Sequence, residues 1–166
     1  MKRAATRPID EGLARAVFDR ALASYNQDFE TFFLARLFDL DITYPDETCV
    51  IRIPVRDFMF NPQGSLHGGV IAFALDVSMG HLLKRTLGAG ITLEMKTQFL
   101  RAATLGEVRC EARFLKKGSS INYLEARMSD SSGRAVAVAT STWMLLPRSG
   151  ANGSQEVERK ETLAVE

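Results

Sequence analysis

The chain has almost no excess charge, few residues that bind metals and no long apolar run. Its 21 basic and 20 acidic residues leave a formal net charge of +1. Nucleic-acid binders usually carry a basic excess or a basic stripe, so this balance disfavours that class. The two histidines and two cysteines lack the spacing of a metal site or of a disulfide framework. Cys49 and Cys110 fall among apolar positions, where a free thiol usually serves packing, and this disfavours a cysteine hydrolase.

Targeting and membrane signals are also missing from the sequence. Lys2 and Arg3 are not followed by the apolar run of a signal peptide, and no 18-residue apolar stretch exists. Asp10, Glu11 and Asp19 argue against a transit peptide. We therefore expect a cytoplasmic protein with reduced thiols and without stable membrane insertion.

Apolar periodicity predicts helices and strands in one domain. Helical spacing over residues 10–24 predicts a first helix, which Asp10 can cap. Alternating apolar residues predict a strand from about Ala35 to Tyr44 and a second over residues 49–55, joined as a hairpin. Residues 69–87 are apolar around most of the helix circumference, which is typical of a helix buried on nearly all sides.

Four long strands are predicted after this buried helix. The short links between them are typical of the hairpin turns of a meander. The last strand, over residues 134–146, is apolar on both faces at several points, so we expect it to be central. A curved antiparallel sheet of five to six strands can enclose the helix, which predicts an α+β fold.

The domain organisation follows from these elements. Residues 1–34 are expected to form an N-terminal helical extension, and residues 35–147 the single α+β domain. Residues 148–166 are polar and charged, which predicts a disordered C-terminal tail.

One ionisable residue interrupts the apolar helix. Between Gly69 and Gly80, only Asp76 can carry a charge. Burying an unpaired carboxylate costs roughly several kcal/mol, so such a group is normally paired or functional. Burial also raises the pKa of a carboxyl group and makes it a stronger base. The structural alternative is an aspartate that reaches solvent or hydrogen-bonds locally.

The start of the same helix suits the binding of negative charge. The run Gly64-Ser65-Leu66-His67-Gly68-Gly69 leads directly into it. The two adjacent glycines allow close backbone approach, and the free N–H groups of a first helical turn meet the requirement of an oxyanion hole. A tight turn into the helix is the alternative use of these glycines.

Helix geometry separates these two features within one chain. Asp76 follows His67 by nine residues, which is about 13 Å along the axis and on the opposite side of the helix. One copy of the helix therefore cannot bring both residues to one reacting atom. Two antiparallel helices related by a two-fold axis would place each helix start beside the other aspartate. If the two features act together, the sequence predicts a homodimer with active sites at the subunit boundary.

These residues resemble a known family. The stretch 61–70, Asn-Pro-Gln-Gly-Ser-Leu-His-Gly-Gly-Val, together with Asp76, is similar to the hotdog-fold thioesterases, specifically the PaaI-like acyl-CoA thioesterase branch. The similarity continues through residues 90–94 and 99–103, at Gly106, and through residues 133–137. It implies a hotdog fold, in which a curved antiparallel sheet wraps around one long central helix. It also implies hydrolysis of a fatty acyl- or aryl-CoA thioester to the free acid and CoA, without a metal or other cofactor.

The resemblance further implies roles for five residues. Asp76 would act either as the nucleophile or as the general base for water, and the N–H of Gly68 would bind the thioester carbonyl. His67 and Asn61 would lie at the thioester. Thr92 would help to position water, although it falls on the polar face of its predicted strand, where β-branched residues are common for structural reasons.

The family binds the CoA nucleotide and phosphates with basic residues at the sheet edge and in a turn. The matching candidates here are Arg101, Lys116, Lys117, Gly118 and Ser119. A solvated charged hairpin is the alternative for the four turn residues. We also expect self-association as a homodimer and, further, a homotetramer built as a dimer of dimers, although no short motif decides between dimer and tetramer. That choice and the length or type of the acyl group stay open.

Two other functions compete with thioester hydrolysis. A hotdog dehydratase or hydratase also pairs a histidine with an acid, but its histidine lies in a Pro-rich loop. A non-catalytic acyl-CoA-binding hotdog protein, such as a ligand-sensing regulator, usually carries a DNA-binding module. The 34 residues before the first predicted strand hold one clear helix, too little for a helix-turn-helix. Asp76 and the glycines at the helix start favour catalysis.

Overall fold

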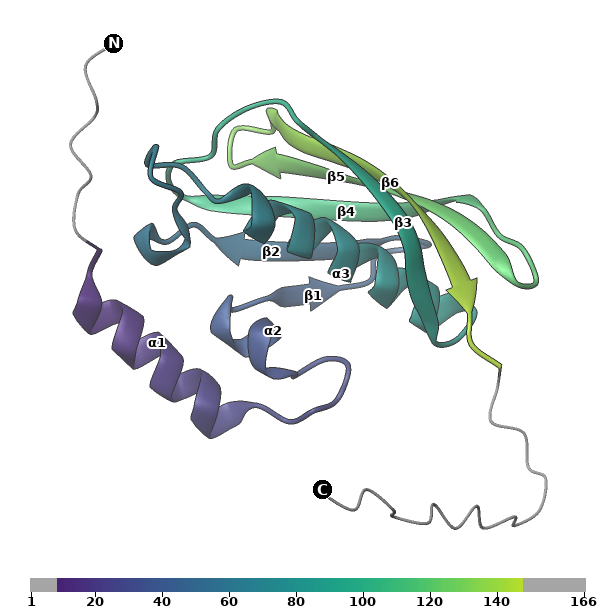
Figure 1. Ribbon diagram of the computed structural model, residues 1–166, viewed down its shortest axis with the longest axis horizontal. Coiled ribbons are helices and arrows are strands. Elements are labelled where there is room, and N and C mark those ends of the chain that lie inside the picture. Colours follow the sequence, from purple (N-terminus) through teal and green to yellow (C-terminus); the bar gives the residue numbers. More distant parts are fainter. Residues whose placement is uncertain (1–8, 148–166) are drawn as a thin grey trace, which may run out of the picture.

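A six-stranded antiparallel sheet forms the body of the protein in a computed structural model that describes residues 9–147 (Figure 1). The strand order is β1-β2-β4-β5-β6-β3, so β1 and β3 form the two edges. β6 lies between β5 and β3, which confirms the expectation that the last strand is central. The strands are β1 (Asp41–Thr43), β2 (Cys49–Pro54), β3 (Gly90–Phe99), β4 (Glu107–Lys116), β5 (Ile121–Asp130) and β6 (Ala135–Leu145).

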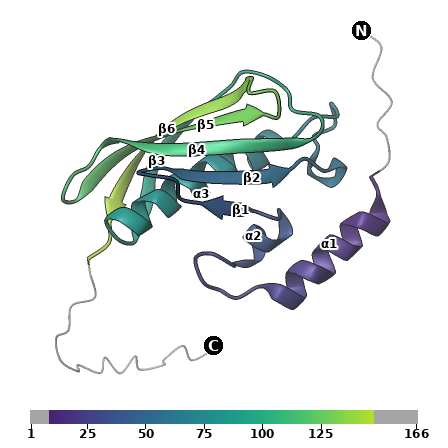
Figure 2. The same ribbon diagram turned by 180° about the vertical axis from the view of Figure 1, so that it is seen from behind.

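The sheet curves around one long helix, α3 (Gly68–Thr86), as the two views in Figures 1 and 2 show. This arrangement confirms the predicted α+β hotdog fold. Ile71, Leu75 and Met79 are buried and belong to the central core. The helix ends where Gly88 adopts a left-handed backbone, with φ of +127°, a conformation that glycine adopts without strain.

The N-terminal segment contains two helices, α1 (Glu11–Ser24) and α2 (Phe33–Leu37). The first is confirmed, and the Asp10 carboxylate caps it by accepting from the N–H of Leu13 at 2.9 Å. The strand expected from Ala35 is wrong in its first half, because residues 33–37 are helical. Here aromatic side chains pack against α3 rather than in the sheet: the ring centroid of Phe38 lies 5.3 Å from that of Phe73.

The prediction of a simple meander is wrong at one connection. β3 pairs with β6, whereas β4 pairs with β2 and β5, so residues 100–106 form a crossover instead of a hairpin. The turn signals in this link are local, and they carry no information about a partner strand that lies about forty residues later in the chain. The crossover runs beside the loop before α3, since the N–H of Leu66 donates to the carbonyl of Ala103 at 2.8 Å. The links β4–β5 and β5–β6 are hairpins, as expected.

An irregularity at Leu93 reverses which residues at the start of β3 face α3. Thr92 pairs with Trp143 and Glu94 pairs with the preceding residue of β6, so Leu93 has no partner in β6. Such a bulge shifts the alternation of the strand by one residue. Thr92 consequently faces α3, and its expected place on the polar face is wrong. Ile91 and Leu93, which uninterrupted alternation would bury, are 43% and 51% exposed.

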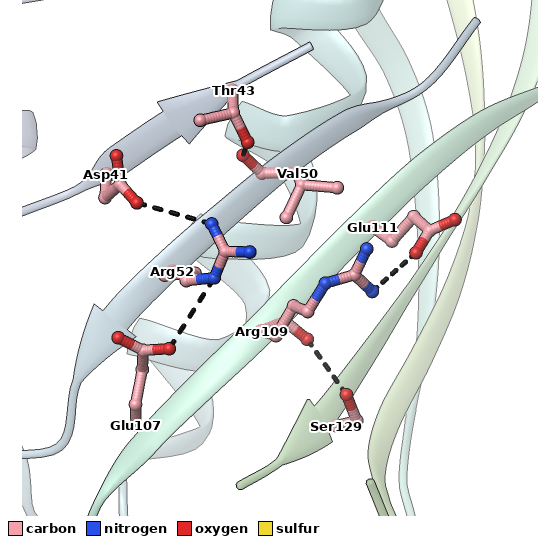
Figure 3. Close-up of polar contacts among 8 residues, drawn as sticks. All are labelled: Asp41, Thr43, Val50, Arg52, Glu107, Arg109, Glu111 and Ser129. Carbon is pink, nitrogen blue, oxygen red and sulfur yellow. Dashed lines mark hydrogen bonds and ion pairs between the residues drawn. The ribbon is translucent and has the colours of Figure 1, made fainter. Parts of the chain in front are cut away.

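The face of the sheet away from α3 is polar, and Figure 3 shows part of it. Arg52 of β2 bridges Asp41 of β1 and Glu107 of β4, with N–O distances of 3.4 and 3.8 Å. Arg109 pairs with Glu111 along β4. These neighbouring opposite charges are typical of a solvated face of an antiparallel sheet.

The predicted tail, residues 148–166, lies outside the described residues, and the division at residue 34 stays a prediction. None of the helices within residues 9–147 has the length and apolar character needed to cross a bilayer.

Candidate active site

Asp76 lies in the middle of α3, on the side that faces β3. Its Oδ1 accepts a hydrogen bond from the hydroxyl of Thr92 at 2.9 Å. Burial raises the pKa of Asp76 above its ordinary value of 3.8, and the hydrogen bond from Thr92 opposes that shift. No cation of the described chain contributes to the shift. The arrangement is a partly desolvated carboxylate, oriented by one hydroxyl, which suits a base or a nucleophile.

The first turn of α3 leaves one backbone donor free. His67 caps the helix, because its Nδ1 accepts from the N–H of Gly69 at 2.8 Å. The carbonyl of His67 accepts from the N–H groups of Val70 and Ile71 at 2.9 and 3.1 Å. Within residues 9–147, the N–H of Gly68 has no acceptor. This amide is therefore available at the positive end of the helix dipole.

The cap also assigns the two nitrogens of the His67 ring. Nδ1 accepts a hydrogen bond, so the neutral ring carries its proton on Nε2. The side chain is exposed. His67 thus fixes the start of the helix with one nitrogen and offers a donor with the other.

The side chain of Asn61 organises the loop that presents His67 and Gly68. Its Oδ1 accepts from the N–H groups of Gln63 and Ser65 at 3.0 and 3.2 Å, and its Nδ2 donates to the hydroxyl of Ser65 at 3.1 Å. Both ends of the amide are engaged within the loop, so its visible contribution is to hold the loop in shape.

Two aromatic residues border these groups, and the sequence analysis did not single out either of them. A Cβ on Gly68 would lie 3.3 Å from Cζ of Phe99, so that ring packs directly on the helix start. A Cβ on Gly80 would lie 2.9 Å from the ring of Trp143, the cross-strand neighbour of Thr92. The family resemblance includes Phe99 without giving it a role, and it does not reach Trp143. The signal for their close packing was the pair of glycines, Gly68 and Gly80, on α3.

Within one chain, the predicted catalytic residues form two separate groups. Asp76 and Thr92 lie together, and so do Asn61, His67 and Gly68. Eight residues of helix separate Gly68 from Asp76, which is about 12 Å along the axis. The structure therefore contains two half-sites at different points along α3.

The candidate CoA-binding residues also fall into two groups. Arg101 follows β3 at the end near Gly68, whereas residues 116–119 form the β4–β5 turn beyond the other end of β3. A hollow of about 620 Å³ lies there, lined in part by residues 87–89 and 118–120. The ten residues of β3 separate the two groups by about 30 Å.

The β4–β5 turn is partly engaged within the chain. Lys117 pairs with Glu47 at 3.4 Å. The N–H of Gly118 donates to Oδ1 of the buried Asn122 at 2.9 Å, so this amide already has an acceptor. Lys116 and Ser119 are exposed.

The two thiols are unsuited to nucleophilic chemistry. Cys49 and Cys110 are free and buried on the inner side of the sheet, and burial raises the pKa of each thiol to about 12. Thiolates are therefore scarce at neutral pH. Among the described residues, no three His, Cys, Asp or Glu side chains are grouped to hold a metal ion.

Comparison with known proteins shows which family this chain is similar to. The model of the thioesterase superfamily matches residues 63–137, which contain both half-sites apart from Asn61. A protein of Saccharolobus solfataricus named "Putative esterase SSO2140" is 32% identical over 100 residues, which are 58% of this chain and 71% of that protein.

Two solved structures illustrate the similarity of fold. A thioesterase-like, phenylacetic acid degradation-related protein of Ralstonia eutropha is 27% identical, with a TM-score of 0.65 over 78% of this chain and 99% of that one. The BH2602 protein of Bacillus halodurans, solved with CoA, is 21% identical, with a TM-score of 0.77 over 86% of this chain and 97% of that one. The chain belongs to the thioesterase superfamily, in its PaaI-like hotdog branch, and is a thioester hydrolase.

Proposed function

We propose that the protein hydrolyses fatty acyl- or aryl-CoA thioesters to the free acid and CoA, at sites shared by two subunits. The observation that carries this proposal is the pair of half-sites on α3: a carboxylate held by Thr92 and a free N–H at Gly68. Thioester hydrolysis needs a base or nucleophile together with a donor for the developing oxyanion, and these half-sites supply them.

A two-fold dimer through β3 would join the half-sites. β3 is an edge strand, so one side of its backbone is open to pairing. The apolar side chains of Ile91 and Leu93 are exposed along it. If two β3 strands pair antiparallel, the Thr92 end of one lies beside the Phe99 end of the other. Each Asp76 then lies near the Gly68 of the second subunit.

The same pairing would unite the CoA-binding candidates. The β4–β5 turn of one subunit and Arg101 of the other come to the same end of the joined sheet. Arg101, Lys116 and Lys117 then supply positive charge from two chains for the phosphates of CoA. The similar fold of BH2602, which was solved with CoA, supports this choice of ligand. We also propose a further dimer of dimers and a cytoplasmic location, where the free thiols would stay reduced.

The reaction can follow two routes with the same residues. The thioester oxygen accepts the Gly68 N–H in both, and Thr92 holds Oδ1 of Asp76 so that Oδ2 is left to react. In the general-base route, Asp76 takes a proton from water, the water oxygen attacks the carbonyl carbon, and the C–S bond breaks as the proton passes to the sulfur. In the nucleophilic route, Asp76 displaces the CoA thiolate and water then hydrolyses the anhydride.

His67 would assist either route through its Nε2–H, which can donate to the thioester, while its Nδ1 keeps the helix start in place. Asn61 would contribute by holding the loop that carries both His67 and Gly68.

Thiol release from a panel of CoA thioesters tests the reaction. We expect CoA release from one or more fatty acyl or aryl members, and the ratio of kcat/KM values across the panel identifies the acyl group. An enoyl-CoA hydratase would instead change enoyl absorbance without release of thiol. Saturable CoA-thioester binding without turnover would support the non-catalytic alternative and overturn our proposal.

Heterodimers test whether the sites are shared. Two inactive chains, Asp76→Asn and Gly68→Pro, are co-expressed with different tags, and the doubly tagged dimer is purified. In a shared-site dimer, one site receives both substitutions and the other receives neither, so about half of the wild-type activity should return. Sites built within one chain would leave the heterodimer as inactive as its parents.

A further inference from the structure

Trp143 is held in one position on the inner side of the sheet. It is 5% exposed, its Nε1 donates to the hydroxyl of Ser141 at 2.6 Å, and that hydroxyl donates in turn to the sulfur of Met79 at 3.0 Å. Gly80 supplies the space for the ring, because a Cβ at that position would lie 2.9 Å from the indole. The hydrogen bonds and this close contact fix the orientation of the indole.

This position makes the indole a neighbour of the reactive carboxylate. Gly80 follows Asp76 by four residues, so the two lie on the same side of α3, one turn apart. Thr92, which donates to Asp76, is the cross-strand partner of Trp143. The ring therefore lies against the helix turn after Asp76 and beside the threonine that holds it.

We infer that Trp143 is a positioning residue for the hydrolysis, which keeps water from one side of the Asp76 carboxylate and supports the Thr92 hydroxyl against it. The inference rests on the proposed function, since it has a consequence for catalysis only if Asp76 reacts. An apolar ring beside a carboxylate takes the place of hydrating water, which makes the carboxylate a stronger base. Burial is the main cause of the raised pKa of Asp76, which agrees with this placement.

The other titratable groups near Asp76 are His81 on α3, Glu94 on β3 and, in the proposed dimer, His67 of the second subunit. On α3, His81 is turned to Tyr44, whose hydroxyl lies 2.7 Å from its Nδ1. On β3, Glu94 contacts Thr142 of β6 at 3.5 Å, on the outer face of the sheet. The proposed dimer adds the second subunit's copy of His67, which is the same in every variant below. Differences between the variants therefore report the surroundings of Asp76.

The test compares pH profiles of kcat/KM for the full-length wild type, Trp143→Phe and Gly80→Ala. The first variant shrinks the ring, and the second pushes an unchanged ring away by adding a Cβ. Each admits water to the carboxylate, which favours its charged form and lowers its pKa. We expect the acid limb of the profile to move to lower pH by about 0.5 to 1 unit, and the plateau to fall several-fold.

A control variant separates this effect from a general loss of stability. Val108→Ala opens the core on β4, away from β3, and should lower the melting temperature without moving the acid limb. A titration of the Asp76 carboxyl carbon by NMR, assigned with Asp76→Asn, gives the pKa without an activity measurement.

Unchanged acid limbs and an unchanged carboxyl titration in folded Gly80→Ala and Trp143→Phe would overturn the inference while leaving the proposed function in place. Full activity of Asp76→Asn would instead overturn the proposed function itself. If Trp143→Phe does not fold, Gly80→Ala decides the question, because it keeps the tryptophan.

Discussion

Replacing Asp76 with asparagine is expected to lower kcat/KM by about a thousand-fold or more, because an amide can neither accept a proton from water nor attack a thioester. Asparagine has nearly the same shape as aspartate and can still accept the hydrogen bond from Thr92, so the fold should persist. Thiol release measures the loss of activity, and circular dichroism with thermal unfolding checks the fold.

The same substitution should also change how stability depends on pH. The pKa of Asp76 is raised in the folded protein, so folding favours its neutral form. The free energy of unfolding then falls as pH rises from 3.8 through the raised value, and at neutral pH the wild type carries the cost of a partly buried charge. Asp76→Asn removes that cost, and its melting temperature at pH 7 should equal or exceed that of the wild type.

A matched control is available on β1, at the opposite edge of the sheet. Asp41→Asn makes the same chemical change at an exposed carboxylate that pairs with Arg52. This variant should keep activity within about two-fold, since exposed ion pairs contribute little to stability. Wild-type turnover by Asp76→Asn would remove Asp76 from the mechanism.

Gly68→Pro should lower kcat by about a hundred- to a thousand-fold, the usual effect of removing one oxyanion donor. Gly68 is the first residue of α3, a position where proline is well tolerated. His67 before it has ψ of 136°, the extended backbone that a following proline requires. The substitution therefore removes the N–H with little change in backbone conformation. Steady-state kinetics of thiol release gives the effect.

Gly68→Ala separates the loss of the N–H from crowding at the same place. Alanine keeps the amide, but its Cβ meets the Phe99 ring at 3.3 Å, as the Cβ of proline would. We expect Gly68→Ala to retain most of the activity that Gly68→Pro loses. Equal losses in the two variants would assign the effect to displacement of Phe99, and the oxyanion role of Gly68 would then be wrong.

Local patterns in the sequence predicted much of the fold. The cap at Asp10, the apolar circumference of residues 69–87 and the alternation of the strands are all short-range signals, and the structure has these elements where they were expected. The crossover after β3 and the helix at residues 33–37 depend on contacts with distant parts of the chain. Periodicity cannot report contacts of that kind.

The candidate site was predicted to a similar extent. Asp76 was recognisable as a lone charge in an apolar helix, and the glycines marked the helix start. The inward direction of Thr92 could not be predicted from the sequence. Polar and apolar residues alternate both before and after Leu93, so the residue types of the strand do not reveal the bulge. The cap made by His67 depends on ring orientation, which spacing does not encode.

The bulge at Leu93 makes the proposed catalysis depend on the register of an edge strand. If Leu93 paired with Trp143 while residues 94–99 kept their partners in β6, Thr92 would lie opposite Met144 and its hydroxyl would turn toward bulk solvent. Asp76 would then lose its hydrogen-bond donor while the pairing of β3 with β6 continued. A slip of one residue at the edge of the sheet would thus be enough, during divergence from a common ancestor, to convert an enzyme into a protein that only retains its ligand.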